Sequence, residues 1–187
     1  RIPGPTAATR GDRMDQQTSG APGQPPLAER VRETLVAAGV TLAVYLPDSV
    51  LIPLTKALEA EPAIRTMVCS REDEGMAIAS GASLAGGIPV VLMEGSGVGF
   101  GGLIMARSQV QRSGYLVVAS HSPALGERFD YHAASRATGV GVMGGLNIPY
   151  VIARDQDDLL VCLRRGIETV VGQRSVVGVL IPPYVLA

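Results

Sequence analysis

Acidic, hydroxyl and imidazole side chains recur where the predicted strands of this sequence end. Asp48 and Ser49 follow the apolar run VTLAVYLP, and the segment from Glu94 to Gly97 closes the run PVVLME. His121 follows the run YLVVAS. Since parallel strands bring their carboxyl ends to one edge of a sheet, these groups are expected to meet there. Carboxylates and imidazoles can move protons, and glycines allow close approach to the backbone, so the pattern predicts an active or binding site.

Glu74 is a second candidate, at the start of a predicted helix made almost wholly of small residues. The stretch SREDEGMAIASGASLAG carries a capping pattern, Ser70 followed by Asp73, which predicts a helix start in this turn. The long solvating side chains of a surface helix are missing, which indicates close approach of another backbone or a ligand. Glu72 and Asp73 are interpreted as solvated charges that complement the helix dipole. Glu74 is expected at the rim of a buried surface.

Apolar strands alternate with helical patterns through most of the chain. This alternation predicts an α/β fold, a single doubly wound domain with a six-stranded, mostly parallel sheet and helices on both faces. Residues 1–26 are rich in Gly, Pro and polar residues and lack the apolar centre of a signal peptide, so they are expected to form a flexible tail before a folded domain at 27–187. Strands are predicted at about 40–47, 64–69, 89–94, 115–120, 148–154 and 175–183.

Composition narrows the classes of protein that the chain can belong to. The chain has 187 residues, a net charge of −1, 47% hydrophobic residues and 18% charged residues, which is typical of one soluble globular domain. The sequence has no basic stripe of the kind that would predict nucleic-acid binding, and it has no apolar run long enough to cross a membrane. Cys69 and Cys162 show no metal-ligand spacing, so we predict free thiols, no metal site in this chain and a cytoplasmic location.

A glycine loop leaves a dinucleotide-binding alternative open. Gly97, Gly99 and Gly102 fit the pattern GxGxxG between a predicted strand and a predicted helix. The dinucleotide fingerprint also requires an acidic residue at the end of the following strand, and that strand ends at Ser120 and His121 without one. The match to the fingerprint is therefore incomplete.

Several ordered motifs resemble one known family. The stretch REDEGMAIASGASLAGGIPVVLMEGSGVG is similar to the pyrimidine-binding domain of thiamine-diphosphate enzymes, in the branch of sulfopyruvate and phosphonopyruvate decarboxylases. In that branch a Glu-Gly pair opens a small-residue helix, and the next strand ends in a motif of the type MQNSGLGN. The PDS at 47–49, His132 and the IPY at 148–150 are also similar. The resemblance covers about residues 27–185.

The resemblance implies roles for the candidate residues. Glu74 matches the glutamate that hydrogen-bonds the pyrimidine nitrogen N1′ of thiamine diphosphate and drives the cofactor to its imino tautomer. Asp48, Ser49 and His132 match the substrate side of the family's site. His121, His132 and Arg128 are candidates for contacting an anionic substrate. The loop that runs against the aminopyrimidine is matched by Glu94, Gly95, Ser96 and Gly97.

Two departures from the family pattern matter. Glu94 and Gly95 stand where the family has Gln-Asn, and Phe100 stands where it has Asn. Glu94 would repel an anionic substrate unless it were protonated or turned away, so a different 2-oxo acid is an open alternative. The family also binds the diphosphate through Mg²⁺ with a GDG motif and a downstream Asn, and this sequence has no such arrangement. The resemblance therefore implies a separate diphosphate-binding subunit that carries the motif and the Mg²⁺.

The resemblance therefore implies the pyrimidine-side subunit of a split thiamine-diphosphate-dependent 2-oxo acid decarboxylase. Such a carboxy-lyase would be active only with its partner, in a hetero-oligomer built on dimers. The resemblance implies an activity like that of sulfopyruvate decarboxylase subunit alpha, which converts 3-sulfopyruvate or 3-phosphonopyruvate to the aldehyde and CO₂. The alternatives are a split carboligase of the acetolactate-synthase type, a non-catalytic subunit and a dinucleotide-binding domain.

Overall fold

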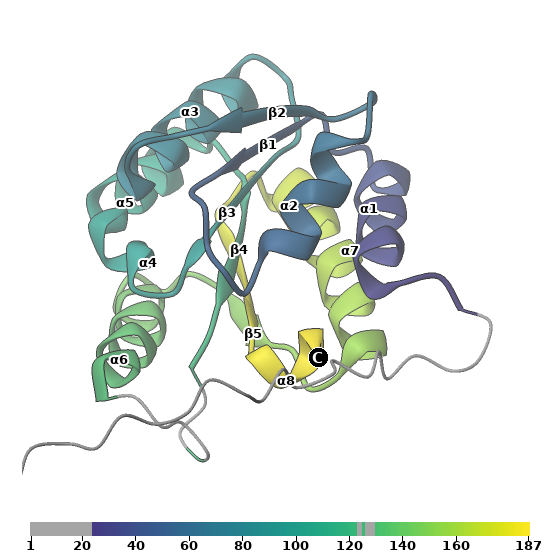
Figure 1. The fold of residues 1–187 in the computed structure, drawn as a ribbon. Coiled ribbons are helices and arrows are strands. Elements are labelled where there is room, and N and C mark those ends of the chain that lie inside the picture. The colour runs from purple at the N-terminus through teal and green to yellow at the C-terminus, as the bar shows by residue number, and fades with distance from the viewer. Residues whose placement is uncertain (1–23, 123–124, 126–129) are drawn as a thin grey trace, which may run out of the picture.

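A computed structural model describes residues 24–122, 125 and 130–187, and residues 1–23 of the predicted tail lie outside this part. Its centre is a six-stranded sheet with the strand order β2-β1-β3-β4-β6-β5 (Figure 1). Every neighbouring pair of strands is parallel. The predicted α/β class and strand number are therefore confirmed. The strands are β1 (Leu42–Tyr45), β2 (Arg65–Val68), β3 (Pro89–Glu94), β4 (Leu116–Ser120), β5 (Tyr150–Ile152) and β6 (Val177–Ile181).

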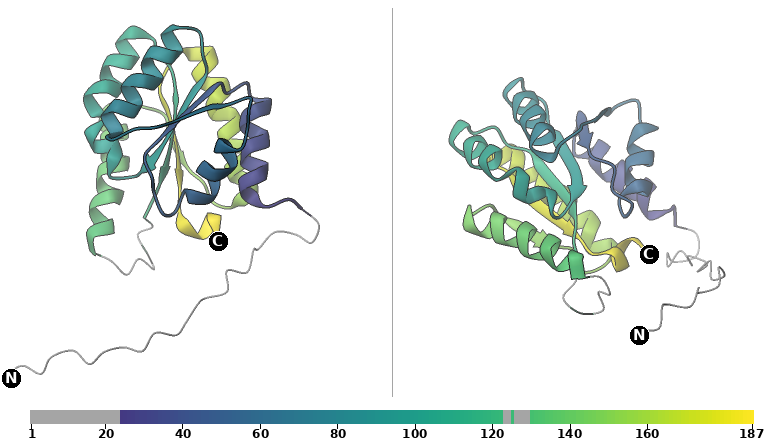
Figure 2. Two further views of the ribbon diagram at one scale, coloured as in Figure 1. Left: turned by 45° about the horizontal axis from the view of Figure 1, so that its top comes forward. Right: turned by 60° about the vertical axis from the view of Figure 1, so that its left-hand side comes forward.

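Helices cover both faces of the sheet. They are α1 (Leu27–Ala37), α2 (Ile52–Glu59), α3 (Glu72–Leu84), α4 (Gly97–Phe100), α5 (Gly102–Gln111), α6 (Asp130–Gly145), α7 (Gln156–Gln173) and α8 (Pro183–Leu186). Figures 1 and 2 show α1, α2 and α7 on one face, with α3, α4, α5 and α6 on the other. The fold is thus doubly wound, as the alternation of strands and helices predicts.

The central strands are buried on both faces. In β3, Val90 and Leu92 belong to the core under α1 and α7, whereas Val91 and Met93 belong to the core under α3 and α5. β4 and β6 are buried along their whole length. Because neither face of these strands contacts water, their sequences are continuous apolar runs, and this made them predictable.

Two helices, α2 and α3, begin without a side-chain cap. The residue before α3 is Arg71, and no side chain caps the helix, so the predicted role of Ser70 as a cap is wrong. Ser70 instead donates its backbone N–H to Glu74 Oε2 at 2.8 Å. α2 also begins without a side-chain cap. Asp48 accepts from the backbone N–H of Val50 at 2.8 Å and so stabilises the turn that precedes α2.

The direction in which strands are added reverses between β1 and β3. After β1 the chain continues into α2 on one face, and after β3 it continues into α4 and α5 on the opposite face. In doubly wound folds the carboxyl ends of the two strands at such a switch point border the usual ligand site. The residues that follow β1 and β3 are therefore the first place to look for a functional site.

Candidate active site

A pocket of about 520 Å³ opens at the carboxyl ends of β1, β3 and β4. The structure brings together in it all four residues predicted on the substrate side, and two residues of the predicted cofactor loop also line it. Gly95, Gly97 and Glu74 are not among its lining residues. The lining residues are Asp48, Ser49, Val50, Glu94, Ser96, Ser120, His121, Ser122, His132, Ala134, Ser135 and Pro183.

Asp48 is buried in this pocket, with 9% of its surface exposed. Its Oδ2 accepts a hydrogen bond of 2.5 Å from the Ser120 hydroxyl, and its Oδ1 accepts from the backbone N–H of Val50 at 2.8 Å. Ser120 ends β4, so this bond connects the ends of two strands that flank β3. Both carboxylate oxygens are occupied by donors, which fixes the side chain in the pocket wall.

Glu94 is held in the pocket wall by two hydroxyl groups. Ser96 donates to its Oε2, and Ser135 of α6 donates to its Oε1. The backbone beside Glu94 is tightly packed, because a Cβ on Gly95 would lie 2.5 Å from the carbonyl oxygen of Ser120. A Cβ on Gly139 of α6 would lie 3.2 Å from the carbonyl oxygen of Gly95. The contact with α6 therefore positions both the loop and its carboxylate.

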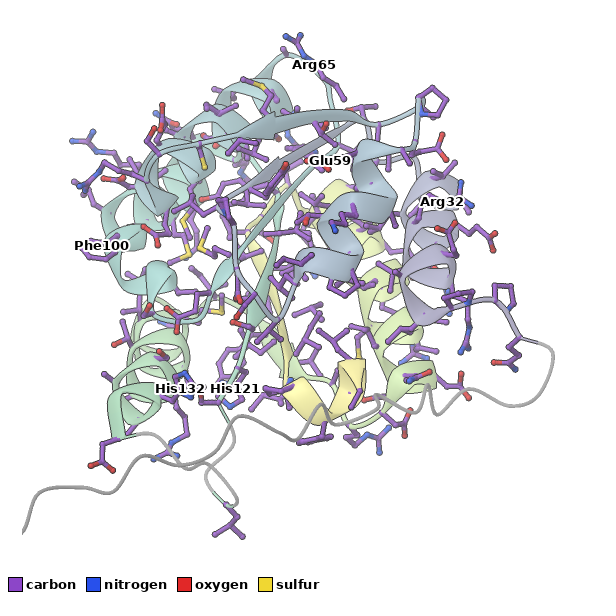
Figure 3. The ribbon with its side chains drawn as sticks, viewed as in Figure 1. Arg32, Glu59, Arg65, Phe100, His121 and His132 are labelled. Atoms are coloured by element: carbon purple, nitrogen blue, oxygen red, sulfur yellow. The ribbon has the colours of Figure 1, made fainter. Side chains whose placement is uncertain are left out.

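The two histidines of the sequence both line this pocket, from the end of β4 and the first turn of α6 (Figure 3). His121 is 7% exposed, and its backbone N–H donates to the carbonyl of Ile181 at 2.9 Å. Burial lowers the pKa of His121, and the charge of Arg136 acts in the same direction. The neutral imidazole is thus favoured. Arg128, the third candidate for contacting an anion, lies outside the described residues.

The acidic side chains in the first turn of α3 have different surroundings. Glu74 is exposed and accepts the bond from Ser70 described above. Asp73 accepts two bonds from the Arg71 guanidinium, at 2.9 and 3.0 Å. These bonds hold the pKa of Asp73 below its usual value. Both groups are therefore engaged at the outer surface of the isolated chain.

Glu72 faces inward instead. A Cβ on Gly97 would lie 2.2 Å from Cγ of Glu72, so this side chain packs directly against the glycine loop. Glu72 is half-buried, and no hydrogen bond or ion pair joins its carboxylate to another side chain of the described residues. The sequence interpretation missed this residue. Helical spacing could have found it, because Gly75, Met76 and Ala79 share its face and are buried.

The glycines of the loop serve helix packing. A Cβ on Gly99 would lie 2.3 Å from Cγ2 of Thr138 in α6, and one on Gly101 would lie 1.9 Å from Sδ of Met76 in α3. The missing side chains let α4 fit between α3 and α6, where it has contacts with both. This packing accounts for Gly99 and Gly101, whereas a Cβ on Gly102 would make only an ordinary contact of 3.5 Å with Val142.

A larger groove of about 750 Å³ lies between α1 and α7. It includes Ile88, the residue before β3, and so lies at the amino ends of the strands, away from the predicted site. Its charged residues Arg164 and Glu168 form an ion pair with each other at 2.7 Å. The smaller pocket is the better candidate, because it contains the ionisable groups that the strand ends bring together.

Two further properties concern the described residues only. No three His, Cys, Asp or Glu side chains among them are grouped so that they could hold a metal ion. None of the helices in this part of the chain is long and apolar enough to cross a membrane. Cys69 and Cys162 are free thiols, and burial raises the pKa of Cys69 to about 11.

The fold and the pocket define a doubly wound α/β domain whose candidate site lies at the switch point of a parallel sheet. Residues 26–145 match the family described as thiamine pyrophosphate enzyme, N-terminal TPP binding domain. The chain belongs to this family. The family resemblance predicted from the motifs is therefore confirmed.

The proteins similar to the chain include two decarboxylases compared by sequence and one solved structure. Sulfopyruvate decarboxylase subunit alpha of Methanothermobacter thermautotrophicus is 30% identical over 125 residues, which cover 66% of this chain and 75% of that protein. Phosphonopyruvate decarboxylase of Streptomyces viridochromogenes is 37% identical over 65 residues, 35% of this chain and 16% of that protein. The thiamine diphosphate-dependent 4-hydroxybenzoylformate decarboxylase of Rhodococcus jostii RHA1 superposes with a TM-score of 0.70 at 18% identity. The superposition covers 87% of this chain and 31% of that one, and it supports the fold alone.

Proposed function

We propose that this chain is the pyrimidine-side subunit of a split thiamine-diphosphate-dependent 2-oxo acid decarboxylase. Family membership and the similarity to a relative named as a subunit alpha support this function. The observation that carries it is the pocket at the switch point, with Glu94 in its wall and the neighbouring glycine loop packed against Glu72. In the reaction the bond between the carboxylate and the 2-oxo carbon breaks, CO₂ leaves, and a proton on that carbon completes the aldehyde.

A carboxylate in the first turn of α3 is the proposed activating group. Thiamine diphosphate, when bound, supplies the nucleophilic carbon and takes up the electron pair that CO₂ leaves behind. A partly desolvated carboxyl group favours a proton shared with a ring nitrogen. Glu74 stays the prediction from the sequence alone. The contacts of α3 favour Glu72, which is half-buried beside Gly97, over Glu74, which is exposed and bonded to Ser70.

The rest of the site is proposed in two parts. The loop residues Glu94, Gly95, Ser96 and Gly97 are proposed to form the wall beside the aminopyrimidine, because glycine at 95 and 97 lets the loop backbone approach its neighbours closely. The substrate side consists of Asp48, Ser49, His121 and His132, which line one pocket. The reference substrates are 3-sulfopyruvate and 3-phosphonopyruvate, after the names of the two relatives.

A second chain is proposed to hold the diphosphate and Mg²⁺ with a GDG motif and a downstream Asn. The outer surface of α3, α4 and α5 offers apolar area to such a partner, because Leu84, Phe100 and Leu103 are 55%, 64% and 64% exposed. Figure 3 shows Phe100 at the outer surface of this layer. We propose a cytoplasmic hetero-oligomer built on dimers, with a small 2-oxo acid as substrate and no nucleic-acid or membrane partner.

Co-purification with the product of the neighbouring reading frame tests this function. The complex is expected to release CO₂ and an aldehyde from a 2-oxo acid only when thiamine diphosphate and Mg²⁺ are both present. Either chain alone is the matched control and should be inactive. A hydroxyketone product would assign a carboligase instead. A complex that binds no thiamine diphosphate would contradict the proposal.

A further inference from the structure

The wall of the pocket contains hydrogen-bond acceptors, the carboxylates of Asp48 and Glu94. From this we infer that the substrate is a 2-oxo acid whose far end carries an uncharged hydrogen-bond donor, such as a hydroxyl group, in place of a second anionic group. Glu94 is the residue that sets this preference. The 2-oxo acid part of the inference rests on the proposed function, whereas the exclusion of an anion rests on the pocket itself.

Glu94 is neither turned away from the pocket nor paired with a cation within the described residues. It lines the pocket, and each of its carboxylate oxygens accepts a hydroxyl proton, from Ser135 and from Ser96. Both carboxylate oxygens are therefore held in place as acceptors in the pocket wall.

Three of the five serine hydroxyls that line the pocket direct their protons at a carboxylate of its wall. A serine hydroxyl has one proton, and Ser96 and Ser135 direct theirs at Glu94. Ser120 directs its proton at Asp48. These three hydroxyls can offer only lone pairs to a bound molecule.

Positive charge is also scarce around this pocket. Among the described residues that line it there is no lysine and no arginine. Arg136 lies close enough to lower the pKa of His121, which favours the neutral imidazole, but Arg136 does not line the pocket. A sulfonate or phosphonate would lose its hydration here without gaining a cationic partner among the described residues that line the pocket. A hydroxyl group would instead donate to a carboxylate.

Comparison of two substrates in the assembled, cofactor-loaded complex tests the inference. We expect kcat/KM for 3-hydroxypyruvate to exceed that for 3-sulfopyruvate, and Glu94→Gln to lower this ratio by about tenfold or more. The matched control is Glu168→Gln, which removes a carboxylate of the surface pair with Arg164 and should leave the ratio unchanged. A wild-type complex that prefers 3-sulfopyruvate, or a ratio that Glu94→Gln does not alter, overturns the inference.

A binding measurement on the full chain tests the exclusion of anions independently of turnover. Because both histidines of the sequence line the pocket, their imidazole NMR signals report on this site alone. Titration with methanesulfonate should shift them in Glu94→Gln at a concentration about tenfold lower than in the wild type. The inference is overturned if the imidazole signals of the variant shift at the same methanesulfonate concentration as those of the wild type, or at a higher one. Inactivity of the complex toward every 2-oxo acid would instead count against the proposed function.

Discussion

The Asp48 carboxylate accepts a 2.5 Å hydrogen bond from the Ser120 hydroxyl, although the two residues are 72 positions apart in the sequence. The bond joins the ends of β1 and β4 above the end of β3, which lies between them. One wall of the pocket is therefore closed by a contact between a buried carboxylate and a buried hydroxyl group.

Removal of this hydroxyl should destabilise the domain. Ser120→Ala leaves a buried carboxylate oxygen without its donor, so the free energy of unfolding should fall by about 1–3 kcal/mol. Urea unfolding at neutral pH measures this loss. The control is Thr169→Ala, which removes an exposed bond to the Arg165 carbonyl and should change stability by less than about 0.5 kcal/mol. Equal losses in the free energy of unfolding would show that the bond between Asp48 and Ser120 stabilises the domain no more than an exposed hydrogen bond does.

Glu72 and Glu74 form a matched pair for a test of cofactor activation. Glu72→Gln keeps the shape of the side chain but removes the proton-sharing carboxylate, so turnover by the reconstituted complex should fall by about 100-fold or more. Glu74→Gln should retain activity within a few fold, because its carboxylate bonds to Ser70 at the outer surface. Co-elution with the partner subunit shows that each variant assembles. Loss of activity in Glu74→Gln alone would restore the assignment made from the sequence.

Gly95 should be intolerant of any side chain. A Cβ there would lie 2.5 Å from the backbone oxygen of Ser120, which cannot rotate away, so Gly95→Ala should lower the free energy of unfolding by about 1–3 kcal/mol. In α6, a Cβ on Gly141 would meet nothing within 4 Å among the described residues. Gly141→Ala should therefore raise stability by roughly 0.5–1 kcal/mol through helix propensity. Thermal unfolding measures both, and a destabilised Gly141→Ala would contradict this packing.

Asp158 should make the stability of α7 depend on pH in the acid range. Hydrogen bonds from Arg154 hold the pKa of Asp158 at about 2, below its ordinary value of 3.8. A lowered folded-state pKa means that the charged form stabilises the native state fully above pH 3.8, and that this is lost as the pH falls toward 2. The stability difference between wild type and Asp158→Asn should therefore shrink over this window. Urea midpoints measured from pH 5 to pH 2 would refute it if the difference stayed constant.

The sheet and several site residues could be predicted from the sequence because their signals are local. β3, β4 and β6 are continuous apolar runs, since both faces of each strand are buried. Asp48, Glu94 and His121 follow or end such runs, and parallel strands bring their carboxyl ends together. The presence of these side chains in one pocket followed from topology, and their proposed roles stay predictions.

The remaining parts of the site depend on contacts that no local pattern reveals. Ser135 reaches Glu94 from α6, 41 residues further along the chain, and only tertiary packing joins them. Glu72 is an exception, because helical spacing places it on the same face of α3 as the buried residues Gly75, Met76 and Ala79 and so could have distinguished it from Glu74. The glycine-rich sequence of α4 predicts a loop because glycine has a low helix propensity, whereas close packing against α3 and α6 stabilises a helical turn there.

Because all the strands run in the same direction, the sheet has one pole at which the strands end and an opposite pole at which they begin. The two poles should differ in their tolerance to chemical modification. All the pocket residues lie at the pole where strands end, whereas the exposed left-handed turns at Arg112 and Arg174 lie at the pole where β4 and β6 begin. A fluorophore or affinity label attached at either turn would be held apart from the pocket by the length of a strand. The starting pole is thus the natural place to modify the protein while its chemistry is studied.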